Sequence, residues 1–138
     1  MSDLIGDWLR RAAARSEQQL ATALAGENVT LHEWAVLRTL HDGPAAPSEV
    51  AERTGLTRGA ITKLVDRLRV RRMVVRAAGG SADRRRQTLA LTGAGARLVA
   101  RVAVLADASD AALVAGLDAA DRERLATLLR RLVEPGSE

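Results

Sequence analysis

Residues 47–68, PSEVAERTGLTRGAITKLVDRL, decide the fold that we expect for this chain. Pro47 suits the first turn of a short helix, and Thr54 and Gly55 end that helix. Thr57 then caps a second helix with a one-sided apolar stripe at i, i+3, i+4 and i+7, formed by Ile61, Leu64, Val65 and Leu68. Two short helices joined by a turn of about three residues that contains a glycine are typical of a helix-turn-helix.

The sequence before this unit predicts two more helices. Apolar residues recur at helical spacing over residues 4–24 and stop at Gly26. Thr30 and Glu33 have the spacing of a capping box, which indicates the start of a helix that ends at residues 42–44.

The sequence after the unit predicts a β-hairpin and then two helices. Residues 73–76 and 87–91 are short β-prone runs on either side of a glycine-containing turn with a basic tip. Thr92 opens the next helix, and Asp118 caps a last one that carries Leu125, Leu128, Leu129 and Leu132. We therefore expect a mainly α chain with a small β-hairpin wing, a winged helix-turn-helix within a single domain over residues 1–138.

Composition excludes several classes of function. The chain has no cysteine, which removes disulfides, thiolate catalysis and thiolate metal sites. Its two histidines, His32 and His41, lie nine residues apart rather than at the i, i+4 spacing of a metal pair. The sequence has no glycine-rich phosphate loop and no serine with a base partner, so we expect neither an enzyme nor a cofactor or metal. No apolar run approaches the roughly 18 residues of a membrane span, and no secretory signal is present, so we expect a cytoplasmic protein.

The charge distribution favours a nucleic-acid partner. Residues 48–92 hold 11 basic and 4 acidic side chains, whereas the rest of the chain holds 10 and 13. Such an excess is expected of a segment that faces phosphates, although a solvated basic surface would give the same count. Trp8 and Trp34 are the only aromatic residues, too few for the stacking platforms of single-strand binders, so duplex DNA is the expected partner.

The helix capped by Thr57 turns a polar face away from its apolar stripe. Thr62 and Lys63 can meet base edges or phosphates, and the guanidinium of Arg58 suits a guanine or a phosphate. Gly59 allows the helix to approach a groove closely. A polar outer face is common on amphipathic helices, so solvent exposure alone is the alternative. The candidate DNA-binding residues of this helix are Thr57, Arg58, Gly59, Thr62, Lys63 and Arg67.

The hairpin tip supplies a second candidate contact. Arg84, Arg85 and Arg86 repel one another and gain most from a dense anionic surface such as the narrow minor groove. Asp83 beside them can hold one guanidinium through a bidentate pair. A solvated loop is the alternative interpretation.

The chain resembles the MarR-type transcriptional regulators. The matching segments are LHEWAVL at 31–37, SEVA at 48–51, LVDRL at 64–68, and DRR at 83–85 followed by LT at 91–92. The resemblance spans nearly the whole chain, and the wing motif is its most specific part. It implies that the helix after Thr57 is the recognition helix, with Arg85 in the minor groove supported by Asp83.

The resemblance also implies a homodimer. Residues 31–92 would form the DNA-binding unit, and residues 1–26 and 92–134 of both chains would form the dimer. Two symmetric recognition helices would lie roughly 34 Å apart, which predicts a pseudo-palindromic site. The function implied is a ligand-responsive repressor, and the alternative is a winged-helix protein-interaction module that no longer binds DNA.

Family members often bind small, frequently phenolic or anionic ligands in a cleft between the dimer helices and the winged domain. A small-molecule effector of unknown identity is therefore an expected partner, with Trp8, His32, Trp34 and Arg38 as candidate cleft residues. Trp34 lies on an apolar helix face, where a tryptophan is more often part of the core.

Two positions depart from the family pattern. Arg72 replaces the glycine that usually follows the recognition helix, and in a left-handed conformation arginine would cost roughly 1 kcal/mol relative to glycine. Gly80 and Ser81 replace the usual Asp-Pro pair before the wing motif, which predicts a looser wing.

Overall fold

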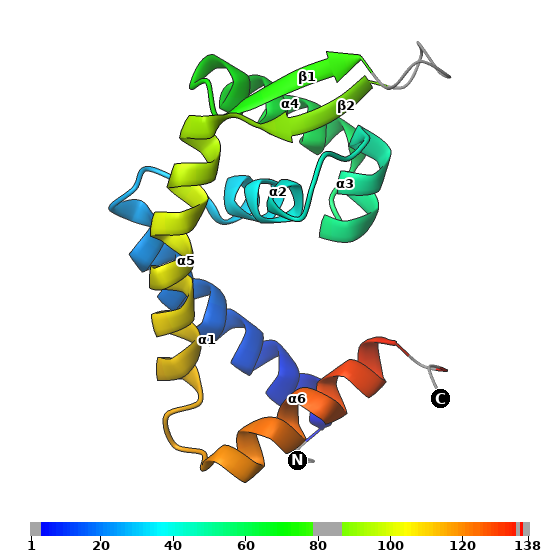
Figure 1. The fold of residues 1–138 in the computed structure, drawn as a ribbon. Helices are drawn as coiled ribbons and strands as arrows, with labels where there is room; N and C mark the ends of the chain where they lie inside the picture. The colour runs from blue at the N-terminus through cyan, green and yellow to red at the C-terminus, as the bar shows by residue number, and fades with distance from the viewer. Residues whose placement is uncertain (1–3, 79–86, 135, 137–138) are drawn as a thin grey trace.

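The computed structural model describes residues 4–78, 87–134 and 136. The described part contains six helices and one two-stranded antiparallel sheet, which confirms the expected mainly helical winged architecture (Figure 1). Its elements are α1 (Ile5–Ala25), α2 (Leu31–His41), α3 (Pro47–Thr54), α4 (Arg58–Val70), β1 (Val74–Ala78), β2 (Gln87–Leu91), α5 (Gly93–Leu113) and α6 (Ala119–Val133). None of the helices in these residues has both the length and the apolar character needed to cross a bilayer.

Side chains cap the helices where the sequence indicated. Thr30 Oγ1 accepts a hydrogen bond from the Glu33 amide at 3.1 Å, and Glu33 Oε1 accepts one from the Thr30 amide at 3.3 Å, which completes the capping box of α2. The side chains of Thr57, Thr92 and Asp118 each accept a hydrogen bond from the amide three residues ahead. Local signals thus fix the starts of four of these helices.

An isolated β-bridge attaches the hairpin to the body of the protein. β1 and β2 pair along their whole lengths, with Val74 opposite Leu91. Ala45, between α2 and α3, exchanges two backbone hydrogen bonds with Leu89 at 3.0 and 2.8 Å. This bridge, which the sequence did not indicate, holds β2 against the helix-turn-helix while the far end of the hairpin projects outward (Figure 1).

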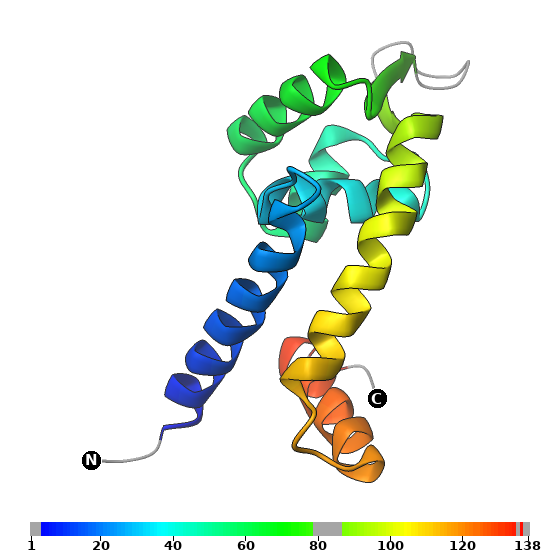
Figure 2. The ribbon, with the colours of Figure 1, turned by 90° about the vertical axis from the view of Figure 1, so that its left-hand side faces the viewer.

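The hydrophobic core lies inside residues 31–92, here called the winged unit, and in the adjoining parts of α1 and α5. Its fully buried large side chains are Leu24, Val36, Leu37, Val50, Ile61, Val65, Leu68, Val74, Leu89, Leu98 and Val102. α1 buries one residue, Leu24, and α6 buries none. Figures 1 and 2 show the first half of α1 and all of α6 at the end of the molecule far from the hairpin.

The junction between α4 and β1 contains a left-handed arginine. Arg72 has φ +59° at the position where the family pattern has glycine, so the unfavourable conformation considered from the sequence is present. The helix still ends as a Schellman motif, because the Met73 amide donates to Leu68 O and the Arg72 amide to Arg69 O, both at 2.9 Å. Gly95 of α5 packs so closely here that a Cβ atom on it would overlap the Met73 carbonyl oxygen.

Candidate nucleic-acid interface

The turn between α3 and α4 sets the direction of the candidate recognition helix. Gly55 ends α3 with φ +74°, a left-handed conformation that favours glycine, and its amide donates to Ala51 O at 2.9 Å. Leu56 and Thr57 complete the connection, and Thr57 caps α4. The two helices and the short turn between them therefore have the helix-turn-helix arrangement that the sequence predicted.

α4 separates an apolar face from a polar face. Ile61, Leu64, Val65 and Leu68 are buried at 0–5% exposure. The candidate DNA-binding residues on the other side are all exposed: Thr57, Arg58, Gly59, Thr62, Lys63 and Arg67. Three of the six carry positive charge, so the face presents cations and hydroxyl groups to solvent.

Hydrogen bonds orient the two threonines of this face. Thr57 Oγ1 accepts from the Ala60 amide at 3.1 Å, so its oxygen faces the first turn of α4. Thr62 Oγ1 donates to Arg58 O at 3.0 Å, which holds its rotamer and leaves the hydroxyl lone pairs available as acceptors for an outside donor. The amides of Arg58 and Gly59 lie in the first turn, where helix N–H groups have no partner within the helix.

Gly59 is not required by the packing of this chain. A methyl group at this position would meet no neighbouring group within 4 Å, and the residue does not have a positive φ. Gly95, by contrast, is required because a larger residue would overlap the backbone at Met73. The open space at Gly59 instead allows a partner to approach the α4 backbone.

The wing candidates Asp83, Arg84, Arg85 and Arg86 lie outside the described residues. The strands that flank them end at Ala78 and Gln87, at the end of the hairpin away from α5 (Figure 1). In the middle of β1, Arg76 is exposed, and its Nη1 donates to Gln87 Oε1 at 3.3 Å across the two strands.

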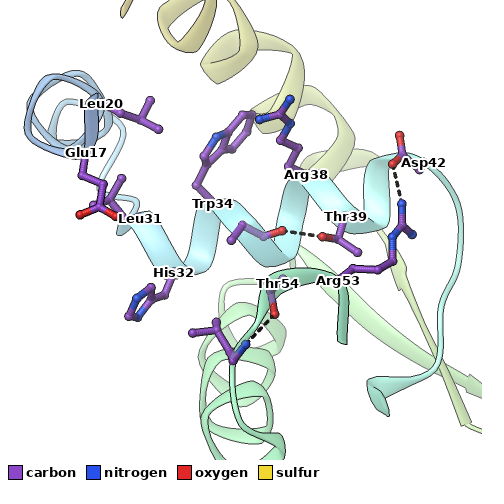
Figure 3. A pocket seen from close by; sticks show the side chains of 12 residues that line it. Glu17, Leu20, Leu31, His32, Trp34, Arg38, Thr39, Asp42, Arg53 and Thr54 are labelled. Atoms are coloured by element: carbon purple, nitrogen blue, oxygen red, sulfur yellow. Dashed lines mark hydrogen bonds and ion pairs between the residues drawn. The ribbon is translucent and has the colours of Figure 1, made fainter. Parts of the chain in front are cut away.

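A cleft of about 610 Å³ opens where α1, α2 and α3 meet (Figure 3). Its lining includes Glu17 and Leu20 from α1, His32, Trp34 and Arg38 from α2, and Arg53 from α3. A second cleft of about 520 Å³ lies between α2 and α5 and shares Leu20, Trp34 and Arg38 with the first. These three side chains form the wall between the two clefts.

The structure brings together three of the four candidate cleft residues. Trp34 and Arg38 lie on the same side of α2, and His32 points from the other side (Figure 3). Trp34 is 5% exposed and belongs to the core as well as to the cleft wall. Trp8 does not line the cleft. It is 51% exposed in the first half of α1, with the Arg11 guanidinium 4.5 Å from its ring centroid.

Besides the candidate Arg38, the cleft contains three charged residues that the sequence did not single out, Glu17, Asp42 and Arg53. Arg53 Nη2 donates to Asp42 Oδ2 at 2.8 Å, so its charge is already paired. Arg38 is exposed and has no ion-pair partner among the described residues. Sequence gives no signal for this meeting of α2 and α3 side chains, because it depends on the angle between the two helices.

The ends of the chain expose apolar side chains. Leu4, Ile5, Trp8 and Leu9 at the start of α1 are 39–73% exposed. In α6 the exposed apolar residues are Leu125 at 38%, Leu128 at 44%, Leu129 at 37%, Leu132 at 62% and Val133 at 79%. Apolar faces of this size are typical of helices that pack against a partner chain.

Comparisons with known sequences and structures agree with this geometry. Residues 27–86 match the sequence model of the MarR family. A protein of Thauera aromatica, whose name describes a transcriptional regulatory protein for the hcr operon, is 31% identical over 140 residues, which cover 100% of this chain and 84% of that protein.

Solved structures extend the likeness beyond the winged unit. BpsR of Bordetella bronchiseptica, whose DNA binding is regulated by 6-hydroxynicotinic acid, has a TM-score of 0.87 and 26% identity over 97% of this chain and 96% of that one. Rv2887 of Mycobacterium tuberculosis, solved in complex with DNA, has a TM-score of 0.79 and 25% identity over 95% and 98%. The chain therefore belongs to the MarR family of transcriptional regulators.

Proposed function

We propose that this chain is a homodimeric repressor that binds double-stranded DNA through α4 and releases it when a small molecule occupies the cleft. The observation that carries the proposal is the exposed face of α4. It combines three cations, Arg58, Lys63 and Arg67, with the acceptor oxygen of Thr62 and the open approach at Gly59. Cations position a protein on phosphates, whereas side chains that reach base edges select the sequence.

The wing supplies the second contact of the proposal. Arg85 is assigned to the minor groove, with Asp83 as its support and Arg84 and Arg86 on phosphates. The support is electrostatic, because adjacent arginines are favoured in the strongly negative potential of a narrow minor groove. α4 and the wing would then bind neighbouring grooves of one half-site.

Exposed apolar side chains support the homodimer. The first half of α1 and the whole of α6 bury no residue, although both carry leucines, and the one buried residue of α1, Leu24, lies near its C-terminal end. Packing against a second copy would cover these side chains and relate the two α4 helices by a twofold axis. The expected site is a pseudo-palindrome with half-site centres roughly 34 Å apart.

One cation of the cleft, Arg38, favours an anionic effector, while Glu17 on the α1 side of the lining carries the opposite charge. Arg38 has no ion pair among the described residues and forms the cleft wall together with Trp34 and Leu20, so a ring carrying a carboxylate suits the cleft. BpsR, a structural relative, responds to such a molecule. The cleft contacts both α1 and the helix-turn-helix, so an occupant would bias the angle between them.

Selection of bound sequences from a random duplex pool tests the DNA proposal. We expect a palindrome, bound with an affinity that falls steeply as salt rises. No binding at micromolar protein in low salt would reject DNA binding and leave the protein-interaction module.

Salicylate and 6-hydroxynicotinate are suitable probes of the cleft, with benzamide as a neutral control. We expect both anions to release the operator from the wild-type protein but not from the Arg38→Gln variant. Release by neither anion would contradict the anionic assignment.

A further inference from the structure

We propose that Arg71 is a positioning residue that fixes the direction of α4 relative to α1, and thereby the separation of the two recognition helices in the dimer. The inference rests on the proposed function, because it concerns a dimer on two half-sites. It adds a residue that lies outside both the DNA-facing side of α4 and the cleft.

The Arg71 side chain joins three helices. Arg71 is the C-cap residue of α4. Its Nη1 donates to the Asn28 carbonyl oxygen at 2.8 Å and lies 3.5 Å from Glu33 Oε2. Asn28 lies in the turn that follows α1, and Glu33 lies in the first turn of α2. One guanidinium therefore ties the end of the recognition helix to the point where α1 meets the winged unit.

The burial of Glu33 makes its ion pair with Arg71 necessary. Glu33 is the only charged residue that is buried in the described part of the chain, with a side-chain exposure of 7%, and the Arg71 side chain is 29% exposed. Glu33 Oε1 is used by the Thr30 amide, and Arg71 is the only cation within ion-pair distance among the described residues. A carboxylate shielded from water needs such a partner, so the position of Arg71 is restrained.

The other basic residues near this helix end behave differently. Arg67, Arg69 and Arg72 are exposed, and none of them forms an ion pair within the part of the chain that the structure describes. The Asn28 turn is itself compact, since Asn28 has φ +55° and the Val29 amide donates to Leu24 O at 3.3 Å. Arg71 is thus bound to a defined point at the end of α1, not to a loose loop.

The consequence concerns the spacing of half-sites. α1 carries the exposed apolar face assigned to the dimer, and α4 carries the face assigned to DNA. A change in the angle between these helices moves both recognition helices, because the twofold axis repeats it. Loss of the Arg71 tie is therefore expected to weaken the preference for one spacer length, beyond any loss of affinity.

The experiment uses the full-length dimer and the palindrome that the wild-type protein selects. Binding is measured on operators whose half-sites are moved together or apart by one and two base pairs. Arg71→Met removes the charge and the donors, and Arg69→Met removes the same charge from an exposed position on the last turn of α4. We expect Arg69→Met to lower the affinity for every spacer by a similar factor. We expect Arg71→Met to reduce the preference for the native spacer to within about threefold of its neighbours.

A second variant separates positioning from folding. The double variant Glu33→Gln/Arg71→Met removes the buried charge that Arg71→Met leaves unpaired, and it should also lose the spacer preference. An unchanged spacer preference in the folded double variant overturns the positioning role, whether or not Arg71→Met itself folds. A wild-type protein that selects no paired half-sites instead overturns the proposed function, and this inference with it.

Discussion

The winged unit and the terminal helices, by which we mean the first half of α1 and all of α6, carry apolar residues at the same helical spacing. These side chains are buried in the winged unit and exposed in the terminal helices. In α4 the apolar positions at i, i+3, i+4 and i+7 are buried at 0–5% exposure. In α6 the corresponding leucines, spaced i, i+3, i+4 and i+7, are 37–62% exposed: Leu125, Leu128, Leu129 and Leu132. An apolar stripe predicts that one face of a helix will be buried. It does not say whether that face packs against the same chain or against a partner chain.

This difference divides the molecule into a part whose apolar side chains are buried within the chain and a part whose apolar side chains stay exposed. The winged unit buries its core together with the adjoining ends of α1 and α5, and the Ala45–Leu89 bridge holds its hairpin in place. The leucines of α6 are 37–62% exposed, so full burial of each would contribute roughly half of the about 1.5–3 kcal/mol expected for a fully exposed side chain. Stability of the winged unit should therefore depend on its own packing, and assembly should depend on the terminal helices.

The largest expected effect is the loss of assembly in Leu125→Glu/Leu129→Glu. The double variant removes apolar area on both sides of a twofold interface and places four carboxylates in it, so the dimer dissociation constant should rise at least about 1000-fold. Sedimentation equilibrium measures the change. Val70→Glu, at a position 84% exposed in the winged unit, is the matched control and should remain dimeric. A double variant as dimeric as the wild type would place the interface elsewhere.

The next effect concerns the place where the two parts join. Gly95→Ala forces a methyl group onto the Met73 carbonyl, so α5 or β1 must shift, and the free energy of unfolding should fall by about 3 kcal/mol. Urea denaturation measures the loss. Gly59→Ala is the control, because its methyl group enters open space in a helix and should be neutral or stabilising by up to about 1 kcal/mol. Equal losses in both variants would contradict the close contact at Gly95.

A smaller effect tests the charge of the winged unit. Arg85→Ala should weaken operator binding about tenfold and reduce the slope of log affinity against log salt by about one. Arg124→Ala removes the same charge from α6, in the terminal part, and should change neither quantity. If the affinity and the salt slope of Arg85→Ala equal those of the wild type, then the wing does not enter the groove.

Local signals could be predicted from the sequence, and contacts between distant segments could not. The capping box of Thr30 and Glu33 and the cap at Thr57 lie within a few residues of their partners, and both are confirmed. The Ala45–Leu89 bridge and the Arg71–Glu33 pair join segments about 40 residues apart. The periodicity of the sequence does not indicate such contacts.

The cleft shows the same limit. His32, Trp34 and Arg38 share one helix, so the sequence could place them near one another, and all three line the cleft. Trp8 lies outside the cleft, and this could not be predicted because the sequence does not say which turn of α1 contacts α2. The assignment of base and phosphate contacts to Thr57, Arg58, Thr62, Lys63 and the arginines of the wing stays a prediction.

The smallest expected effect comes from the left-handed residue inside the winged unit. Arg72→Gly should raise the free energy of unfolding by about 1 kcal/mol, because glycine adopts φ +59° without the steric cost that arginine has. Asn28→Gly, at φ +55°, is the control and should gain less, since asparagine tolerates this conformation better than arginine. Urea denaturation resolves the two gains. A loss of stability in Arg72→Gly would mean that the arginine side chain contributes more to the fold than its backbone conformation costs.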